Sequence, residues 1–392
     1  MSSIVTFEDK PPEGMIQFGV GQPSADLLPV ELMREATEEF FRTAHPEELN
    51  YGVLQGDQRF RDSLARFLSK NYGTPVGADG LFVTGGNSQA LDFVCSHLSK
   101  PGDTIIVEEP CYFLAFQIFA DNGLNIVSVP VDEDGLDMDQ LAETLKRTRA
   151  ALLYTIPSYQ NPSGRTMSAA RRERLVELSK EHDFLILADE VYQLLSYYDP
   201  PPDALGSMSE SGTVLSLGSF SKILAPALRL GWIQTSHGMA KRLTDIGAVN
   251  SGGSLNHFTS HIVRYAIDMG LQQAHLERLR RSYKARVEAM DAALKECLSG
   301  HATWVRPDGG YFFWLKLNEN ENMSAQELRD RALERQVGFL SGHLFSSCGG
   351  MKTHIRLSFA YYNEGDIREG IARLKPLFES SRPSPPSTRM ER

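Results

Sequence analysis

Short apolar runs recur through the middle of the chain, and longer amphipathic stretches separate them. Most of these runs are continuous rather than alternating, which is typical of strands buried on both faces of a parallel sheet. The predicted strands are 81–84, 104–107, 126–130, 150–156, 184–188 and 213–217. The predicted helices between them are 89–98, 139–147 and 168–182. This alternation predicts an α/β domain with a mostly parallel, doubly wound sheet.

The pattern changes near residue 275, where a basic amphipathic stretch predicts a long helix over 275–298 with a solvated charged face. The segments that follow predict an antiparallel pair of strands, a helix, a further strand and a last helix. Their ranges are 303–305 with 310–317, then 324–336, 354–358 and 364–378. These elements predict a second, smaller α+β domain.

The change of pattern divides the chain into four expected parts. They are an N-terminal arm over 1–30 that packs with the small domain, a large domain over 31–275, a small domain over 276–379 and a tail over 380–392. The tail is rich in Ser, Pro and Arg, a composition typical of disorder. A length of 392 residues fits about two globular domains.

The overall charge limits the partners that the chain is expected to bind. It carries 50 acidic and 40 basic residues, which argues against nucleic acid or an anionic membrane. No apolar run reaches the length of about 18 residues that a transmembrane helix needs. Residues 1–14 lack the pattern of a secretory signal. The four cysteines have no CxxC spacing and are expected to be reduced, so the expected location is the cytoplasm.

Lys222 is a single lysine inside an otherwise apolar run, with Ser219 and Ser221 before it and Arg229 after it. Desolvation and a neighbouring cation both lower the pKa of an amine, and a neutral amine forms Schiff bases with carbonyl compounds. Two hydroxyl groups and a guanidinium are suitable ligands for a phosphate. The segment therefore points to pyridoxal 5'-phosphate (PLP) as a cofactor. A lysine that merely extends its amine to solvent explains this segment equally well by itself.

A second segment has the features of a phosphate-binding site. Gly85 and Gly86 follow a predicted strand, and Asn87 and Ser88 open the helix that comes next. Glycines let the backbone approach an anion, and a helix N-terminus offers free amide groups and a favourable dipole. A glycine-rich loop alone is a weak signal, but together with the serines and arginine around Lys222 it forms a second side of one phosphate site.

Other polar residues follow predicted strands, at the carboxyl edge where open α/β sheets bind ligands. Asp189 ends an apolar run, and the ring nitrogen of PLP is a suitable partner because an anion keeps that nitrogen protonated. Tyr192 reaches the phenolic oxygen of the ring if a helical turn starts there, and Tyr112 is suited to stack on the ring. Simpler alternatives are a turn or cap for Asp189, a turn for Asn161 and core packing for Tyr112.

In identity, order and spacing these residues resemble those of fold type I PLP enzymes, and within them the class I and II aminotransferases. The most similar branch contains the 2-aminoadipate and kynurenine aminotransferases. The resemblance extends from about residue 16 to about residue 378 and implies an aspartate aminotransferase-like fold. It implies that Lys222 forms the Schiff base with PLP and moves a proton between the substrate and the cofactor. It further implies that Asp189 pairs with the ring nitrogen, Tyr192 and Asn161 bind the phenolic oxygen, and Tyr112 stacks on the ring.

The same resemblance assigns the ligands of the phosphate and the substrate. The implied phosphate ligands are Gly86, Asn87, Ser88, Ser219, Ser221 and Arg229. Arg356 is the implied ligand of the substrate carboxylate, because a guanidinium binds a carboxylate through two hydrogen bonds. Gly21 and Asn161 complete the implied substrate site, and a structural arginine at a strand edge is the alternative for Arg356. No metal site is expected, since His257 and His261 lack a third zinc ligand.

Two further segments match the family. Residues 50–56 resemble the YGxxxG motif, whose tyrosine, here Tyr51, reaches the phosphate of the neighbouring subunit's cofactor. This implies a homodimer with shared active sites. Residues 18–23, which include Gly21, resemble the GxP loop that covers the substrate. Two positions depart from the family pattern: Ala227 stands where glycine is usual, and Asn87 where serine is more common.

The expected activity is transfer of the amino group of an amino acid to a 2-oxo acid. The same groups also support elimination or decarboxylation, so a PLP-dependent lyase, such as a C–S lyase, or a specialised biosynthetic enzyme is the alternative. A transcription regulator with an aminotransferase-like domain is disfavoured by the short segment before the GxP loop and by the acidic charge. Residues 22–28 contain no arginine for a second carboxylate, and their apolar residues suit an aromatic or aliphatic side chain.

Overall fold

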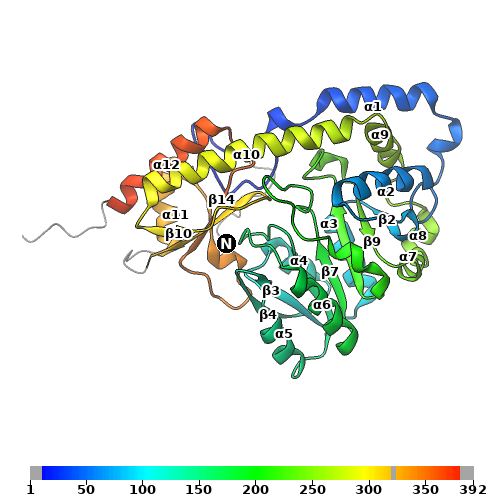
Figure 1. Ribbon diagram of the computed structural model, residues 1–392, viewed down its shortest axis with the longest axis horizontal. Coiled ribbons are helices and arrows are strands. Elements are labelled where there is room, and N and C mark those ends of the chain that lie inside the picture. Colours follow the sequence, from blue (N-terminus) through cyan, green and yellow to red (C-terminus); the bar gives the residue numbers. More distant parts are fainter. Residues whose placement is uncertain (1–10, 319–323, 380–392) are drawn as a thin grey trace, which may run out of the picture.

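The computed structural model describes residues 11–318 and 324–379, and the predicted tail over 380–392 lies outside these residues. Two sheets organise the described chain, a large sheet of eight strands and a small sheet of four. The long helix α10 (Leu271–Leu298) runs along both of these parts, as Figure 1 shows. The division into an arm, two domains and a tail stays a prediction, but the two sheets fall on either side of the expected boundary near residue 275.

The large sheet contains all six strands predicted for the middle of the chain, each within two residues of the predicted ends. Its strands are β2 (Leu81–Thr84), β3 (Thr104–Glu109), β4 (Asn125–Asp132), β5 (Gly135–Leu136), β6 (Ala150–Thr155), β7 (Leu185–Asp189), β8 (Val214–Ser219) and β9 (Gly231–Gln234). Their order is β2-β9-β8-β7-β6-β3-β4-β5. β9 and β5 run opposite to the other six strands of this sheet, and neither of these two strands was predicted.

Helices cover both faces of the large sheet, because successive strand residues point to opposite sides. Leu152 of β6 packs in the apolar cluster that includes Phe60 and Phe119, whereas Leu153 packs with Leu141 and Leu175. The first cluster is formed with α2 (Gln58–Tyr72), α3 (Asn87–Leu98) and α4 (Phe113–Asp121), and the second with α5 (Met138–Leu145) and α6 (Ala169–His182). The predicted doubly wound arrangement is confirmed.

The remaining helices of this part lie toward one end of the large sheet (Figure 1). They are α1 (Val30–Thr43), α7 (His237–Thr244), α8 (Gly247–Gly252) and α9 (His257–Asp268). Helix α1 packs against α9, which in turn packs against α2. Phe40 of α1 is fully buried against Ala266 of α9, so this group forms a small apolar core of its own.

The small sheet is antiparallel, and its elements match the predicted α+β pattern. Its strands are β10 (Ala302–Trp304), β11 (Phe312–Leu317), β13 (Leu340–Ser341) and β14 (His354–Ser358), and its helices are α11 (Ala325–Glu334) and α12 (Glu364–Glu379). Helices α10 and α12 pack together over it (Figure 1). The described part of the N-terminal segment joins here, because β1 (Ile16–Gln17) pairs in parallel with β12 (Val337–Gly338).

Helix α10 differs from its prediction in the environment of its charges. The predicted solvated face is wrong for Arg286 and Asp291, which are both buried. Arg286 donates a hydrogen bond to Oγ of Ser24 at 3.0 Å, and Trp304 donates to Asp291 at 2.9 Å. The N-terminal segment and the small sheet cover these charges, which the helix sequence alone does not reveal. No helix in the described residues, α10 included, is long and apolar enough to cross a membrane.

Candidate active site

The predicted site residues gather at the carboxyl edge of the large sheet. Asp189 is the last residue of β7 and Ser219 the last of β8, while Asn161 lies in the loop after β6. Parallel strands end at one common edge, so side chains from distant parts of the sequence meet there. Strand β14 of the small sheet adds Arg356 from the opposite side, and the N-terminal segment adds Gly21.

Lys222 lies in the turn after β8, half-buried, at the centre of this group. Its Nζ atom donates a hydrogen bond to the carbonyl oxygen of Gly21 at 2.7 Å and lies 5.2 Å from the ring centroid of Tyr311. Burial, and then the positive charge of Arg356, lower the pKa of Lys222 to about 8, against the attraction of Asp189. About a tenth of the amine is therefore neutral at pH 7, far more than in a free lysine, and the neutral form is the nucleophile.

Asp189 is buried, and both of its carboxylate oxygens accept hydrogen bonds from side chains. Asn87 Nδ2 donates to Oδ1 at 2.7 Å, and the Tyr154 hydroxyl donates to Oδ2 at 2.8 Å. Burial raises the pKa of Asp189, while these two hydrogen bonds and the charge of Lys222 act in the opposite direction. Sequence reasoning missed Tyr154. The feature of the sequence that could have indicated it is a tyrosine inside the buried strand β6, because a buried tyrosine hydroxyl needs a hydrogen-bond partner.

The predicted phosphate residues lie together beside the start of α3. Gly86 is the N-cap of this helix, with φ of 90°, and no side chain caps the helix there. A Cβ atom at Gly86 would lie 3.0 Å from Nη2 of Arg229, so glycine permits the close approach of the guanidinium. Ser219 Oγ donates to Ser221 Oγ at 2.9 Å. Hydroxyl groups, a guanidinium and a helix N-terminus are a donor set that fits a phosphate dianion.

This arrangement corrects one detail of the prediction for Lys222. The order of residues in the sequence predicted Arg229 as the second cation that lies beside the amine and lowers its pKa. Arg229 is exposed and stands over Gly86, whereas Arg356 is the cation that acts on the amine. The reason is topological, because β14 carries Arg356 across from the small sheet. Ser88 is exposed on the first turn of α3.

Arg356 is only 3% exposed and reaches the site from β14. Its Nη1 donates to Oδ1 of Asn161 at 2.9 Å and its Nη2 donates to the carbonyl oxygen of Gly19 at 2.9 Å. The guanidinium carbon lies 4.0 Å from the ring centroid of Phe312. Burial lowers the pKa of Arg356 to about 10. Among the ion pairs of residues 11–318 and 324–379 none involves Arg356, and such a buried cation is a ready binding site for a carboxylate.

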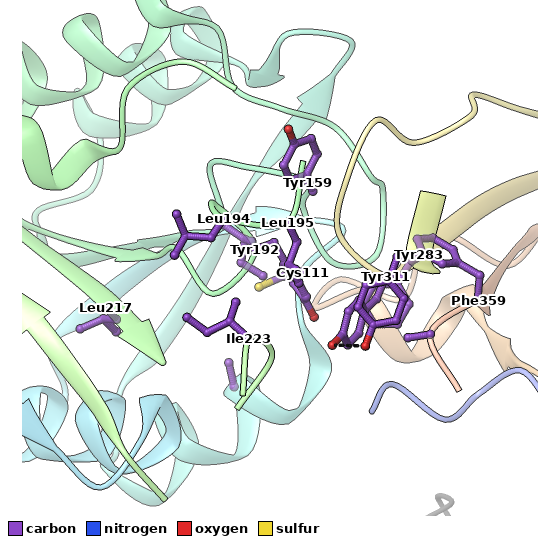
Figure 2. Packing of buried hydrophobic residues seen from close by; sticks show 14 of the residues in the cluster. Cys111, Tyr159, Tyr192, Leu194, Leu195, Leu217, Ile223, Tyr283, Tyr311 and Phe359 are labelled. Carbon is purple, nitrogen blue, oxygen red and sulfur yellow. Dashed lines mark hydrogen bonds between the residues drawn. The ribbon is translucent and has the colours of Figure 1, made fainter. Parts of the chain in front are cut away.

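Aromatic side chains line the boundary between the two sheets, and sequence reasoning missed most of them. Figure 2 shows Tyr192, Tyr311 and Tyr283 in one group, with the Tyr283 and Tyr311 hydroxyl oxygens 3.1 Å apart. The rings of Tyr192 and Tyr311 are 5.5 Å apart. Tyr311 also donates to the backbone oxygen of Lys222 at 3.2 Å. The feature of the sequence that could have indicated Tyr311 is the aromatic run at the start of β11. Tyr112, which was predicted, is half-buried, and burial raises its pKa to about 12.

Comparisons with known proteins agree with this geometry. The family model for aminotransferase class I and II matches residues 13–374. The chain belongs to this family. Aromatic-amino-acid aminotransferase 1 of Thermococcus litoralis is 34% identical, over 92% of this chain and 87% of its own length. The structure of Pyrococcus horikoshii kynurenine aminotransferase in complex with PMP is 31% identical with a TM-score of 0.86, and the match covers 94% of this chain and 92% of that one.

An uncharacterised HTH-type transcriptional regulator of Bacillus subtilis is also similar, with 31% identity over 92% of this chain and 73% of its own length. The family therefore supplies the fold of proteins named as regulators as well as of enzymes. The named aminotransferases and the site geometry together identify this chain as a PLP-dependent aminotransferase, which transfers an amino group from an amino acid to a 2-oxo acid. The predicted family, aspartate aminotransferase-like fold, cofactor and activity are confirmed.

One predicted residue of this aminotransferase does not join the other site residues in the described chain. Tyr51 is 84% exposed, in the loop between α1 and α2. This loop packs on α9, where a Cβ atom at Gly52 would lie 2.5 Å from Nδ1 of His257. The Nε2 atoms of His257 and His261 are 3.1 Å apart. The described residues contain no group of three or more side chains suited to hold a metal ion.

Proposed function

We propose that Lys222 is the residue of this aminotransferase that binds PLP covalently and carries the proton in amino-group transfer. The observation that supports this most is the environment of its amine, whose pKa is lowered to about 8 by burial and by the charge of Arg356, against the attraction of Asp189. When bound, PLP supplies a protonated aromatic ring that accepts electrons from the bond that breaks at the substrate α-carbon. Lys222 would then remove the proton from that carbon and return it to C4′ of the cofactor.

The other proposed cofactor contacts are made by residues at the same carboxyl edge of the large sheet. Asp189 pairs with the ring nitrogen, since a buried carboxylate with donors on both oxygens favours a cation beside it. Tyr192 and Asn161 bind the phenolic oxygen, and Tyr112 stacks on the ring. The phosphate is held at the start of α3 and by the turn after β8. Its proposed ligands are Gly86, the backbone amide of Asn87, Ser88, Ser219, Ser221 and Arg229, with Tyr51 from the second subunit.

Arg356 binds the α-carboxylate of the substrate. Its guanidinium is buried, and it now donates to neutral oxygens of Asn161 and Gly19. A guanidinium forms stronger hydrogen bonds to a carboxylate than to neutral oxygens, so a substrate carboxylate can replace them. Gly21 lies beside it, because a Cβ atom there would be 3.8 Å from Nη2 of Arg356 and 3.2 Å from the Phe312 ring. The loop with Gly21 therefore covers the substrate and excludes water from it.

The surroundings of Arg356 favour amino acids with one carboxylate and an apolar or aromatic side chain. The rings of Phe312 and Phe345 lie 4.0 and 4.9 Å from its guanidinium carbon. Residues 22–28 offer no arginine for a second carboxylate. The name of the Thermococcus litoralis relative, an aromatic-amino-acid aminotransferase, supports the same substrate class.

The active enzyme is a homodimer of the cytoplasm. Tyr51 is surrounded in the chain by exposed apolar side chains, among them Leu49 at 63% and Val53 at 58% exposure, with Phe41 and Phe258 on α1 and α9. Such a group is typical of a surface that a second subunit covers. All four cysteines are free thiols, and Cys348 is exposed, which suits a reducing compartment.

A direct experiment tests the covalent role of Lys222 and the reaction together. Borohydride reduction of the purified enzyme followed by peptide mapping should place the pyridoxyl group on Lys222, and a label on another lysine would contradict the assignment. An amino donor alone should convert the cofactor stoichiometrically to its amine form, and a 2-oxo acid should reverse the change. Continuous release of pyruvate and ammonia from β-substituted alanines, with no amine form from any donor, would indicate a lyase instead.

A further inference from the structure

The side chain of Asn87 faces Asp189 rather than the phosphate end of the site. Asn87 is the first residue of α3, and its Nδ2 atom donates to Oδ1 of Asp189 at 2.7 Å and to the backbone oxygen of Leu217 at 3.1 Å. These two contacts use both amide hydrogens. The reverse orientation of the amide would bring its oxygen against two acceptors, so the surroundings determine which way it points.

The remaining polar atom of Asn87 does not suit a phosphate. Its Oδ1 atom is buried and has no hydrogen-bond partner among the described residues. An amide oxygen accepts hydrogen bonds but cannot donate one. A phosphate dianion is also an acceptor, so it has to be bound by donor groups. The backbone amide at the start of α3 stays available for the phosphate, whereas the side chain acts elsewhere.

Tyr154 holds the second oxygen of Asp189. It is fully buried on β6, where its ring packs edge-on against Phe119 with centroids 5.4 Å apart. Burial raises the pKa of Tyr154 well above its ordinary value, so its hydroxyl keeps its proton and donates. A carboxylate has about four acceptor positions, so Asn87, Tyr154 and the backbone amide of Val191 leave room for a further N–H.

We propose that Asn87 and Tyr154 are positioning residues that keep Asp189 ionised and turned toward the ring nitrogen of PLP. The side chain of Asn87 thus serves the ring end of the cofactor and not its phosphate. The inference rests on the proposed pairing of Asp189 with the ring nitrogen. Without donors on both oxygens, the buried carboxyl would gain a proton and lose its ability to keep the ring nitrogen charged. Apart from Tyr154, the titratable groups whose charges interact with Asp189 are Lys222, Glu108, Cys111, Tyr112 and Tyr192.

The first test separates the ring end of the site from its phosphate end. The affinity of the apoenzyme is measured for PLP and for pyridoxal, which lacks the phosphate, in N87A and in S221A as the matched control. N87A should weaken both ligands by the same factor, roughly tenfold or more, because a hydrogen bond to a buried charge is lost. S221A should weaken PLP and leave pyridoxal unchanged. A loss for PLP alone in N87A, or no loss for either ligand, would overturn the inference.

The second test is a pH titration of the holoenzyme, followed by the absorbance of the bound cofactor. The pKa of this titration depends on the charge at the ring nitrogen. With less positive charge on the ring, the Nζ atom of Lys222, once bonded to the cofactor, would hold its proton more tightly. Y154F keeps the ring that packs on Phe119, and both Y154F and N87A should therefore raise the pKa of this transition, as D189N should. A shift in D189N without a shift in the other two variants would overturn this inference alone. No shift in D189N would reject the pairing of Asp189 with the ring nitrogen itself.

Protein stability is measured in parallel, so that a folding defect is recognised. N87S retains a hydroxyl at the start of α3 and serves as a second variant, in which the pyridoxal affinity should fall as in N87A. If N87S and Y154F keep the melting temperature of the apoenzyme and also keep the wild-type affinity for pyridoxal, the positioning role is refuted.

Discussion

Arg356 donates a hydrogen bond from Nη1 to Oδ1 of Asn161 at 2.9 Å, and this contact joins the small sheet to the loop after β6. Both residues are buried. The two proposed substrate ligands thus come from different sheets and hold each other in place before a substrate arrives. Donors that are already held in place favour binding, because their side chains lose little conformational entropy when the ligand binds.

Replacement of Arg356 by lysine should raise KM for all amino acid substrates by a similar factor, roughly tenfold to a hundredfold, because an ammonium cannot form two parallel hydrogen bonds to a carboxylate. Steady-state kinetics with several donors measures the effect. Arg149→Lys, at an exposed position, is the matched control and should leave KM unchanged. An unchanged KM in Arg356→Lys would show that another residue binds the carboxylate.

The pKa of Lys222, lowered to about 8, predicts the pH dependence of PLP incorporation. The amine is protonated below this pKa and nucleophilic above it, so the rate at which apoenzyme binds PLP covalently should rise with pH and level off above about 8. Arg356→Gln removes a repelling charge and should move the midpoint to higher pH, while Asp189→Asn should move it lower. Stopped-flow absorbance measures the rate, and shifts of the opposite sign would reject this account of the amine.

Gly86→Ala should lower the affinity for PLP, because the new Cβ would lie 3.0 Å from Nη2 of Arg229 and displace the guanidinium from the start of α3. The positive φ of 90° adds backbone strain on the order of 1–3 kcal/mol. Gly102→Ala is the matched control, with φ of 91° and nothing within 4 Å of its Cβ. Thermal unfolding should show destabilisation in both variants, whereas equilibrium titration with PLP should show weaker binding only in Gly86→Ala.

Complementation between subunits tests the role of Tyr51. Lys222→Ala should be inactive, and Tyr51→Phe should bind PLP roughly tenfold more weakly, because a hydrogen bond to the phosphate is lost. In a mixture of the two, a heterodimer has one site with an intact Lys222 and an intact Tyr51. Random pairing should therefore restore activity in up to about a quarter of the sites. An unchanged PLP affinity of Tyr51→Phe, or a monomer in sedimentation at micromolar concentration, would contradict shared active sites.

Patterns of neighbouring residues determined much of this structure. Continuous apolar runs predicted the six central strands, because a strand covered on both faces has no polar side to alternate with. The amine of Lys222 was recognised from its apolar flanks, and the order of the polar residues around it indicated the family. The strands β9 and β5 were missed, since glycine and glutamine take two of the four positions of β9 and β5 has only two residues, so neither forms a continuous apolar run.

The tertiary structure decided which distant groups act on one another. It placed Arg356 rather than Arg229 beside Lys222, brought Tyr154 and Asn87 onto Asp189, and buried charges of α10 that the helix pattern had assigned to solvent. Each of these contacts joins elements that are far apart in the chain. The physical reason is that the pKa and hydrogen bonds of a buried group depend on everything packed against it, and the order of the strands and the docking of the two sheets determine that packing.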